Sequence, residues 1–159
     1  HFYGHAELSI ELAKPVLKEL TFPPSFSSDA LLLVRYHDDV IEPTPKAVKR
    51  MLRRLDGRID LFRAMCDLKR GDSLAQAPQC RKRVAVADEL DRILDQIIEA
   101  QEAFSLRDLA IGGTDLIELG VAQGPEIGRL LDRALEAVID EQVENDRDHL
   151  LAFVRKQWR

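Results

Sequence analysis

Residues 112–145 read GGTDLIELGVAQGPEIGRLLDRALEAVIDEQVEN. Gly120 is placed to end one short helix and Gly124-Pro125 to begin the next, because glycine favours the position after a helix and proline its first position. The segment therefore predicts two helices joined by a tight turn. N–H groups in the first turn of a helix have no partner inside that helix. The turn thus predicts an anion site at Gly124, Pro125 and Gly128.

The same pattern also suits an ordinary tight corner between two helices. In that interpretation Gly128 permits close packing, and the charge of Glu126 disfavours an anion. The residues alone leave both interpretations open.

The composition favours a folded helical protein. Hydrophobic residues make up 45% of the 159 positions and charged residues 32%, a balance typical of a core surrounded by solvated helices. We predict an all-α fold, in which a helical lobe precedes a smaller helical tail. The predicted helices span residues 6–20, 29–39, 45–55, 58–70, 79–101, 114–119 and 125–141, with a last one that Asn145 and Asp148 cap and that ends at Trp158.

The cysteines and the hydropathy of the chain predict its cellular compartment. Cys66 and Cys80 form no CxxC motif, which favours two free thiols in a reducing compartment. No apolar run approaches the roughly 18–20 residues of a membrane helix. We therefore expect a cytoplasmic chain that does not associate with membranes.

The charge is unevenly distributed along the chain. The net charge is −5, yet residues 46–83 hold 12 lysines and arginines against 4 aspartates and glutamates. A local basic region can attract an anion even in an acidic protein. Around the helix at 45–55, which Thr44 caps, the basic residues fall on one arc and the apolar ones on the other. We predict that this arc contacts RNA phosphates, the alternative being a solvated surface; it comprises Lys46, Lys49, Arg50, Arg53 and Arg54.

The C-terminal motif resembles a known family. Its residues are Gly113, Asp115-Leu116, Leu119-Gly120, Gly124-Pro125, Ile127-Gly128, Asn145 and Leu150-Leu151. The pattern is similar to the C-terminal RNA-binding region of bacterial CCA-adding tRNA nucleotidyltransferases, which bacterial poly(A) polymerases share. Upstream, HFYGHAELSIELAKPVLKELTFP at 1–23 and LLLVRYHDD at 31–39 resemble the second half of the HD-type domain that many of these enzymes carry.

The resemblance implies a division of the chain and a role for it. Residues 1–104 would be part of an HD-type domain with a helical body, and residues 105–159 an RNA-binding tail. The chain would hold the acceptor and T arms of tRNA for an N-terminal nucleotidyl-transfer head of the same parent polypeptide. Because the head's glycine-serine loop and Asp-x-Asp pair do not occur in it, we interpret the chain, which begins at His1, as a fragment without catalytic residues that is inactive alone.

The resemblance also implies a metal site. In an HD-type domain, histidines and aspartates bind a divalent ion that activates water. His5, His37 and Asp72 match the later ligands of that pattern, and the upstream His-Asp dyad is absent here. No cofactor follows from the residues present, except a divalent metal (Mg, Mn or Ni) if the parent completes the site. Partly buried histidines paired with nearby carboxylates are the alternative.

Two other functions stay open at this stage. The first is a metal-dependent HD-type phosphohydrolase. The second is a helix-hairpin-helix module that binds DNA, since LGVAQGP at 119–125 resembles that turn.

Overall fold

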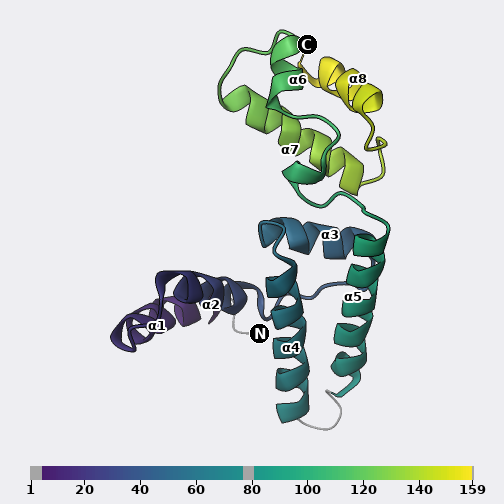
Figure 1. The fold of residues 1–159 in the computed structure, drawn as a ribbon. Helices are drawn as coiled ribbons and strands as arrows, with labels where there is room; N and C mark the ends of the chain where they lie inside the picture. The colour runs from purple at the N-terminus through teal and green to yellow at the C-terminus, as the bar shows by residue number, and fades with distance from the viewer. Residues whose placement is uncertain (1–4, 77–80, 159) are drawn as a thin grey trace. The chain divides into compact units, whose positions relative to one another are not determined.

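A computed structural model of the chain describes residues 5–76 and 81–158, and side chains from residue 7 onward. Within those ranges the chain forms helices and no strand, which confirms the predicted all-α class (Figure 1). The helices are α1 (His5–Glu19), α2 (Pro24–Tyr36), α3 (Pro45–Arg54), α4 (Ile59–Ala75), α5 (Lys82–Glu99), the 3-10 helix η2 (Leu106–Asp108), α6 (Gly113–Glu118), α7 (Pro125–Ile139) and α8 (Arg147–Trp158).

The ends of α3 follow from local chemistry. The Thr44 hydroxyl accepts a hydrogen bond from the N–H of Ala47 at 3.3 Å, and Pro45 takes the first helical position, as predicted. At the other end the N–H of Gly57 donates to Leu52 at 2.9 Å, and the helix ends in a left-handed residue. That residue is Asp56, with φ of 53°, and Gly57 follows it with φ of 73°. The helix end predicted at residue 55 is therefore followed by two left-handed residues.

Several helix boundaries differ from the predictions. Helix α2 begins at Pro24, five residues before the predicted start, because Pro24 takes the first helical position. Helix α4 continues through Gly71 to Ala75, where a loop was predicted, and Ser73 is buried there with its hydroxyl donating to the carbonyl of Lys69. Both segments contain residues with a low helix propensity, and tertiary packing overrides that propensity. The predicted first residues of the helix at 79–101 lie outside the described residues.

The chain divides into two compact units that do not follow chain order. One holds His1–Pro43 and Arg58–Ile93, and the other holds Thr44–Gly57 and Leu94–Arg159. Helix α3 thus groups with the C-terminal helices. The chain passes from one unit to the other at 43/44, 57/58 and 93/94. The boundary predicted at 104/105 stays a prediction.

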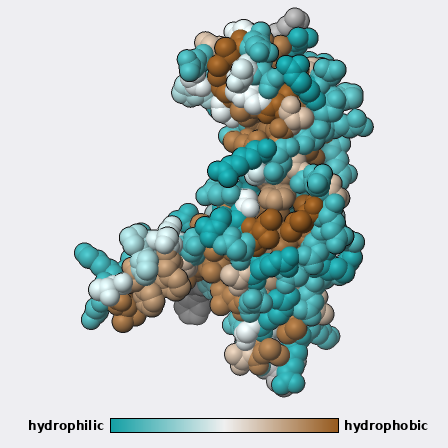
Figure 2. All heavy atoms as spheres, viewed as in Figure 1, coloured by the Kyte–Doolittle hydropathy of each residue, from teal (hydrophilic) through white to brown (hydrophobic). Residues whose placement is uncertain are grey.

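The first unit combines a helical hairpin with a pair of helices joined by ion pairs. Helices α1 and α2 pack together, and α2 packs on α4. Helix α1 leaves apolar side chains exposed, and Figure 2 shows brown and pale-brown atoms over this hairpin. Arg70 of α4 donates to Asp88 of α5 at 2.8 Å and also to Asp91. Cys66 is fully buried, and burial raises the pKa of its thiol to about 12.

The second unit has its core between η2, α6, α7 and α8. Helix α7 contacts the other three, and its Leu130 and Ala134 are fully buried. Gly113 lets α6 approach α7 closely, because a Cβ there would lie 3.4 Å from the side chain of Ile127. The core consists of Ala103, Leu109, Ile111, Leu116, Val121, Leu130, Ala134, Leu135, Ile139, Leu150 and Val154.

We expect Leu130→Ala to lower the free energy of unfolding by about 2–5 kcal/mol, because it removes a buried side chain and leaves a cavity. Ile117→Ala is the matched control, since Ile117 lies in the same unit and is exposed; it should cost under about 1 kcal/mol. Urea unfolding followed by circular dichroism measures both. Equal losses would contradict the position of this core.

Candidate nucleic-acid interface

The basic arc predicted on α3 lies against a row of carboxylates on α7. Asp132, Glu136 and Asp140 are four residues apart, so they line one face of α7. Arg53 donates to Glu136 at 2.8 Å and to Asp132 at 3.0 Å. Asp140 is held by two cations, Lys46 and Arg50, each at 3.0 Å. We call Asp132, Glu136 and Asp140 the acidic row of α7.

The acidic row compensates much of the charge on α3. Lys46 and Arg50 hold the pKa of Asp140 below its ordinary range, the hydrogen bond from Lys46 contributing most. The side chain of Arg50 is still 58% exposed, and one guanidinium nitrogen makes its contacts with Asp140. Because a guanidinium has five N–H donors, Arg50 retains donors that point to solvent. Arg54 is exposed at the end of the helix.

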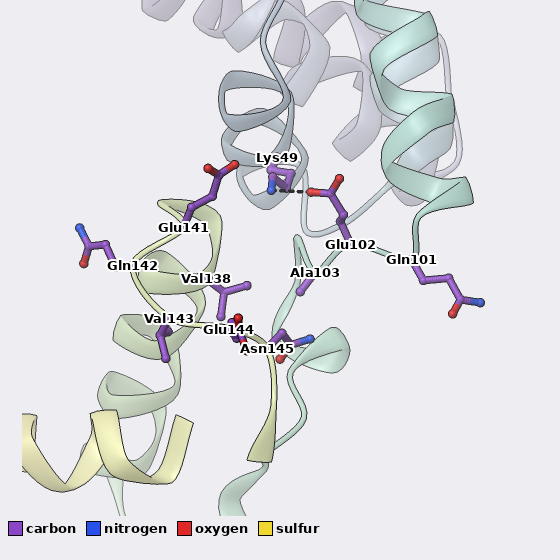
Figure 3. A pocket seen from close by; sticks show the side chains of 10 residues that line it. All are labelled: Lys49, Gln101, Glu102, Ala103, Val138, Glu141, Gln142, Val143, Glu144 and Asn145. Atoms are coloured by element: carbon purple, nitrogen blue, oxygen red, sulfur yellow. Dashed lines mark hydrogen bonds and ion pairs between the residues drawn. The ribbon is translucent and has the colours of Figure 1, made fainter. Parts of the chain in front are cut away.

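Lys49 differs from the other residues of the arc. It is only 3% exposed, and its ammonium donates to Glu102 at 2.7 Å. The pair borders a cavity of about 630 Å³ whose other walls include Val138, Glu144 and Asn145, and Figure 3 shows Lys49 and Glu102 facing each other beside it. Lys49 therefore holds α3 to the segment after α5.

Two further hollows lie beside the arginines of α3. One of about 530 Å³ is lined by Arg50, Arg53, Arg54 and the end of α7. The other, also about 530 Å³, has Arg53 on one side and residues 104–108 on the other. Arg53 thus stands between two concave surfaces that are open to solvent.

The turn before α7 has the predicted form. Gly120 ends α6 with φ of 97°, and the N–H of Val121 donates to Leu116 at 3.0 Å. Gly124 precedes α7 with φ of 155°, a conformation that side chains disfavour, and Pro125 takes the first position. A Cβ at Gly128 would meet nothing within 4 Å, so Gly128 leaves an open surface in the first turn of α7. The close packing expected of Gly128 in the corner interpretation occurs at Gly113 instead.

Two polar residues of the C-terminal motif, Asn145 and Asp115, connect the segments around α6 and α8 through hydrogen bonds. The Asn145 amide donates to the carbonyl of Asp108 at 2.7 Å and accepts from the N–H of Ala110 at 2.9 Å. Asp115 accepts from the N–H of Gly112 at 2.7 Å and from Arg147 at 3.0 Å. Sequence patterns did not indicate the contacts of Asn145 or the contact of Asp115 with Arg147, since those partners lie more than 30 residues apart.

The cap of α8 differs from the predicted one. Asp146, and not Asn145 with Asp148, accepts from the N–H of His149 at the start of α8. Asn145 is engaged with the 108–110 segment, so it cannot serve as that cap.

The comparisons with known proteins agree on one family. A family described as tRNA nucleotidyltransferase domain 2 matches residues 17–154, which is most of the chain. The chain belongs to this family. The CC-adding tRNA nucleotidyltransferase of Thermus thermophilus is 32% identical over 158 residues, and a CCA-adding enzyme of Streptococcus pyogenes is 30% identical over 80 residues, 48% of the chain. A CCA-adding enzyme of Lactobacillus delbrueckii is 45% identical over 47 residues, 30% of the chain.

The chain corresponds to part of these relatives. It spans 34% of the Thermus protein, 19% of the Streptococcus protein and 12% of the Lactobacillus protein. No solved structure matches the chain. The family membership therefore rests on sequence, and the structure supplies the geometry of domain 2.

The residues predicted to bind a metal are only partly within the described structure. The side chain of His5 lies outside the described residues. His37 follows the end of α2, where its Nδ1 lies 2.6 Å from the carbonyl oxygen of Val34, and Asp72 in α4 accepts from Gln76 at 2.7 Å. Among the described side chains, no group of three or more His, Cys, Asp and Glu could hold a metal ion.

An ammonium lies beside His37. Lys69 donates to the carbonyls of His37 and Asp39, each at 2.7 Å. This contact involves the main chain of His37, and the metal set of His5, His37 and Asp72 stays a prediction. No helix within the described ranges combines the length and apolar composition that crossing a membrane requires.

We expect Asp115→Asn to lower the Tm at pH 7 by about 2–5 °C, because Gly112 and Arg147 lose an ionised acceptor. The N–H of Gly112, first, and Arg147 lower the pKa of Asp115. Since the folded pKa lies below the unfolded one, this stabilisation is complete above the unfolded pKa and is lost as the pH falls through the folded pKa. Wild type and variant should therefore converge as the pH falls below the unfolded pKa of Asp115. Glu99→Gln is the control, and a pH-independent difference would contradict this role of Asp115.

Proposed function

We propose that this chain is the tRNA-binding portion of a CC- or CCA-adding tRNA nucleotidyltransferase. It holds the acceptor and T arms while an N-terminal head of the same polypeptide transfers nucleotides. Membership in the family described as tRNA nucleotidyltransferase domain 2 carries the proposal, together with the CC-adding and CCA-adding activities for which the relatives are named. Nucleotidyl transfer is thereby assigned to the longer protein.

The basic side chains of α3 supply the phosphate contacts in this proposal. Lys46, Arg50 and Arg54 are exposed and reach solvent from one helix face. Arg53 is partly buried between the acidic row and two hollows. Lys49 acts indirectly, since its buried pairing with Glu102 fixes the position of α3.

The mode of recognition follows from the chemistry of RNA helices. The deep, narrow major groove of an RNA duplex hides its base edges, so proteins contact its phosphates and sugars and respond to its shape. Cations held in a fixed arrangement suit that task, because phosphate contacts position a nucleic acid without reading sequence. The acidic row of α7 provides such an arrangement by restraining Arg50 and Arg53.

The turn at Gly124, Pro125 and Gly128 is the second contact. The first-turn N–H groups of α7 carry partial positive charge, and the open surface at Gly128 admits a ligand to the backbone. The ion pair between Glu126 and Arg129 at 2.5 Å offsets the negative charge nearest to this turn.

We expect the triple variant Lys46→Gln, Arg50→Gln and Arg54→Gln to weaken tRNA binding about tenfold and to reduce the salt slope by about 1 for each lost phosphate contact. Fluorescence anisotropy with a labelled tRNA transcript between about 50 and 200 mM salt measures both quantities. The control variant changes three exposed cations of the first unit, Lys14, Lys18 and Arg35, to glutamine. Unchanged affinity and slope would remove α3 from the interface.

We expect Gly128→Ala to stabilise the fold by about 0.4–1 kcal/mol and to weaken tRNA binding. The substitution favours the helix and meets no atom of the protein, yet it places a methyl group on the contact surface. Gly71→Ala is a matched control, because Gly71 also lies inside a helix and a Cβ there meets nothing within 4 Å. It should stabilise α4 and leave binding unchanged. Equal binding by the two variants would exclude the turn from the contact.

A further inference from the structure

A second basic patch lies in the first unit, at the start of α5. Arg81, Lys82 and Arg83 are consecutive and exposed. Among the described residues, no hydrogen bond or ion pair engages these three side chains. We call them the α5 patch.

The other arginines around α4 and α5 have carboxylate partners. Arg58 pairs with Asp29 and Asp60, and Arg63 pairs with Asp91. Arg70 and Arg92 are likewise held, by Asp88 and Glu89 respectively. The carboxylates closest to the α5 patch in sequence are thus already engaged by other arginines.

The sequence of α5 offers the patch no partner of its own. Side chains three and four positions along a helix are the ones that meet. From the α5 patch those positions are residues 84–87, Val-Ala-Val-Ala, and all four are uncharged. The first turn of α5 contains no acidic residue.

The patch also stands at the unfavourable end of its helix. The N-terminus of a helix carries partial positive charge, so cations there destabilise the helix and carboxylates stabilise it. Three adjacent cations repel one another as well. Helix stability therefore does not explain Arg81, Lys82 and Arg83, whereas a bound polyanion would relieve both repulsions.

We propose that the α5 patch is a second phosphate-binding site for tRNA, carried by a different unit from the α3 cations. This inference rests on the proposed function and adds to it a contact outside the C-terminal unit. Lys82 and Arg83 take the first two positions of α5, about 100° apart, and Arg81 directly precedes them, so the three cations can contact neighbouring phosphates of a backbone.

The test compares three variants of the full chain with wild type, using one labelled tRNA transcript. In the first, Arg81, Lys82 and Arg83 become glutamine; the control changes Lys14, Lys18 and Arg35 in the same unit to glutamine, with the same loss of charge. In the third, Arg81→Lys, Lys82→Arg and Arg83→Lys preserve the charge. Anisotropy titrations over a range of salt concentrations give the affinity and the slope for each.

We expect the glutamine variant of the α5 patch to lose about tenfold in affinity at about 0.1 M salt and about 2–3 in salt slope. The charge-preserving variant and the control should stay within about twofold of wild type. The Tm of the glutamine variant should be equal to or higher than that of wild type, because cations leave the helix N-terminus.

The other outcomes overturn the inference in distinguishable ways. If wild type binds tRNA and both glutamine variants match it, the α5 patch is not a contact and the proposed function stands. If the two glutamine variants lose affinity equally, only net charge matters and the assigned site is wrong. If wild type itself does not bind tRNA, the proposed function fails and the inference fails with it.

Discussion

The apolar contacts of α3, together with its ion pairs to the acidic row of α7, are the interactions on which the position of this helix in the C-terminal unit depends. They join a ten-residue helix to a segment that begins about 40 residues later in the chain. Met51, Leu52 and Leu55, on the apolar side of α3 and at its end, are buried as well. Charge fixes the orientation of α3, and apolar contact supplies most of its attachment, since exposed ion pairs contribute little free energy.

This arrangement changes how the basic arc acts electrostatically. An arc of five cations in the sequence becomes, in the fold, one buried lysine, three cations paired with three carboxylates, and the exposed Arg54. The carboxylates offset part of the positive charge and restrain Arg50 and Arg53. Under the proposed function, such restrained cations would favour a ligand whose phosphates match fixed positions over a flexible polyanion.

Local chemistry determined the features that the sequence could predict. Thr44 and Pro45 start α3, Gly120 ends α6, and Gly124 with Pro125 starts α7, because each acts on its own backbone or its near neighbours. The burial of Lys49 could not be predicted, since Glu102 lies 53 residues away. The same limit applies to the acidic row, whose contacts with α3 span 79–94 residues, and to the division into two interleaved units.

The glycines of the C-terminal motif differ in how far the fold itself requires a glycine at each position. Gly120 and Gly124 have positive φ, so the backbone of the turn requires these two, whereas a Cβ at Gly113 would be in contact with Ile127 at 3.4 Å. Gly128 has a helical conformation and open space around its α-carbon. A glycine at such a position costs about 0.8–1 kcal/mol relative to alanine and gives the described fold nothing in return. The cost is understandable if another molecule approaches the backbone there. Under the proposed function, Gly128 is therefore the residue of the turn whose presence a ligand would best explain.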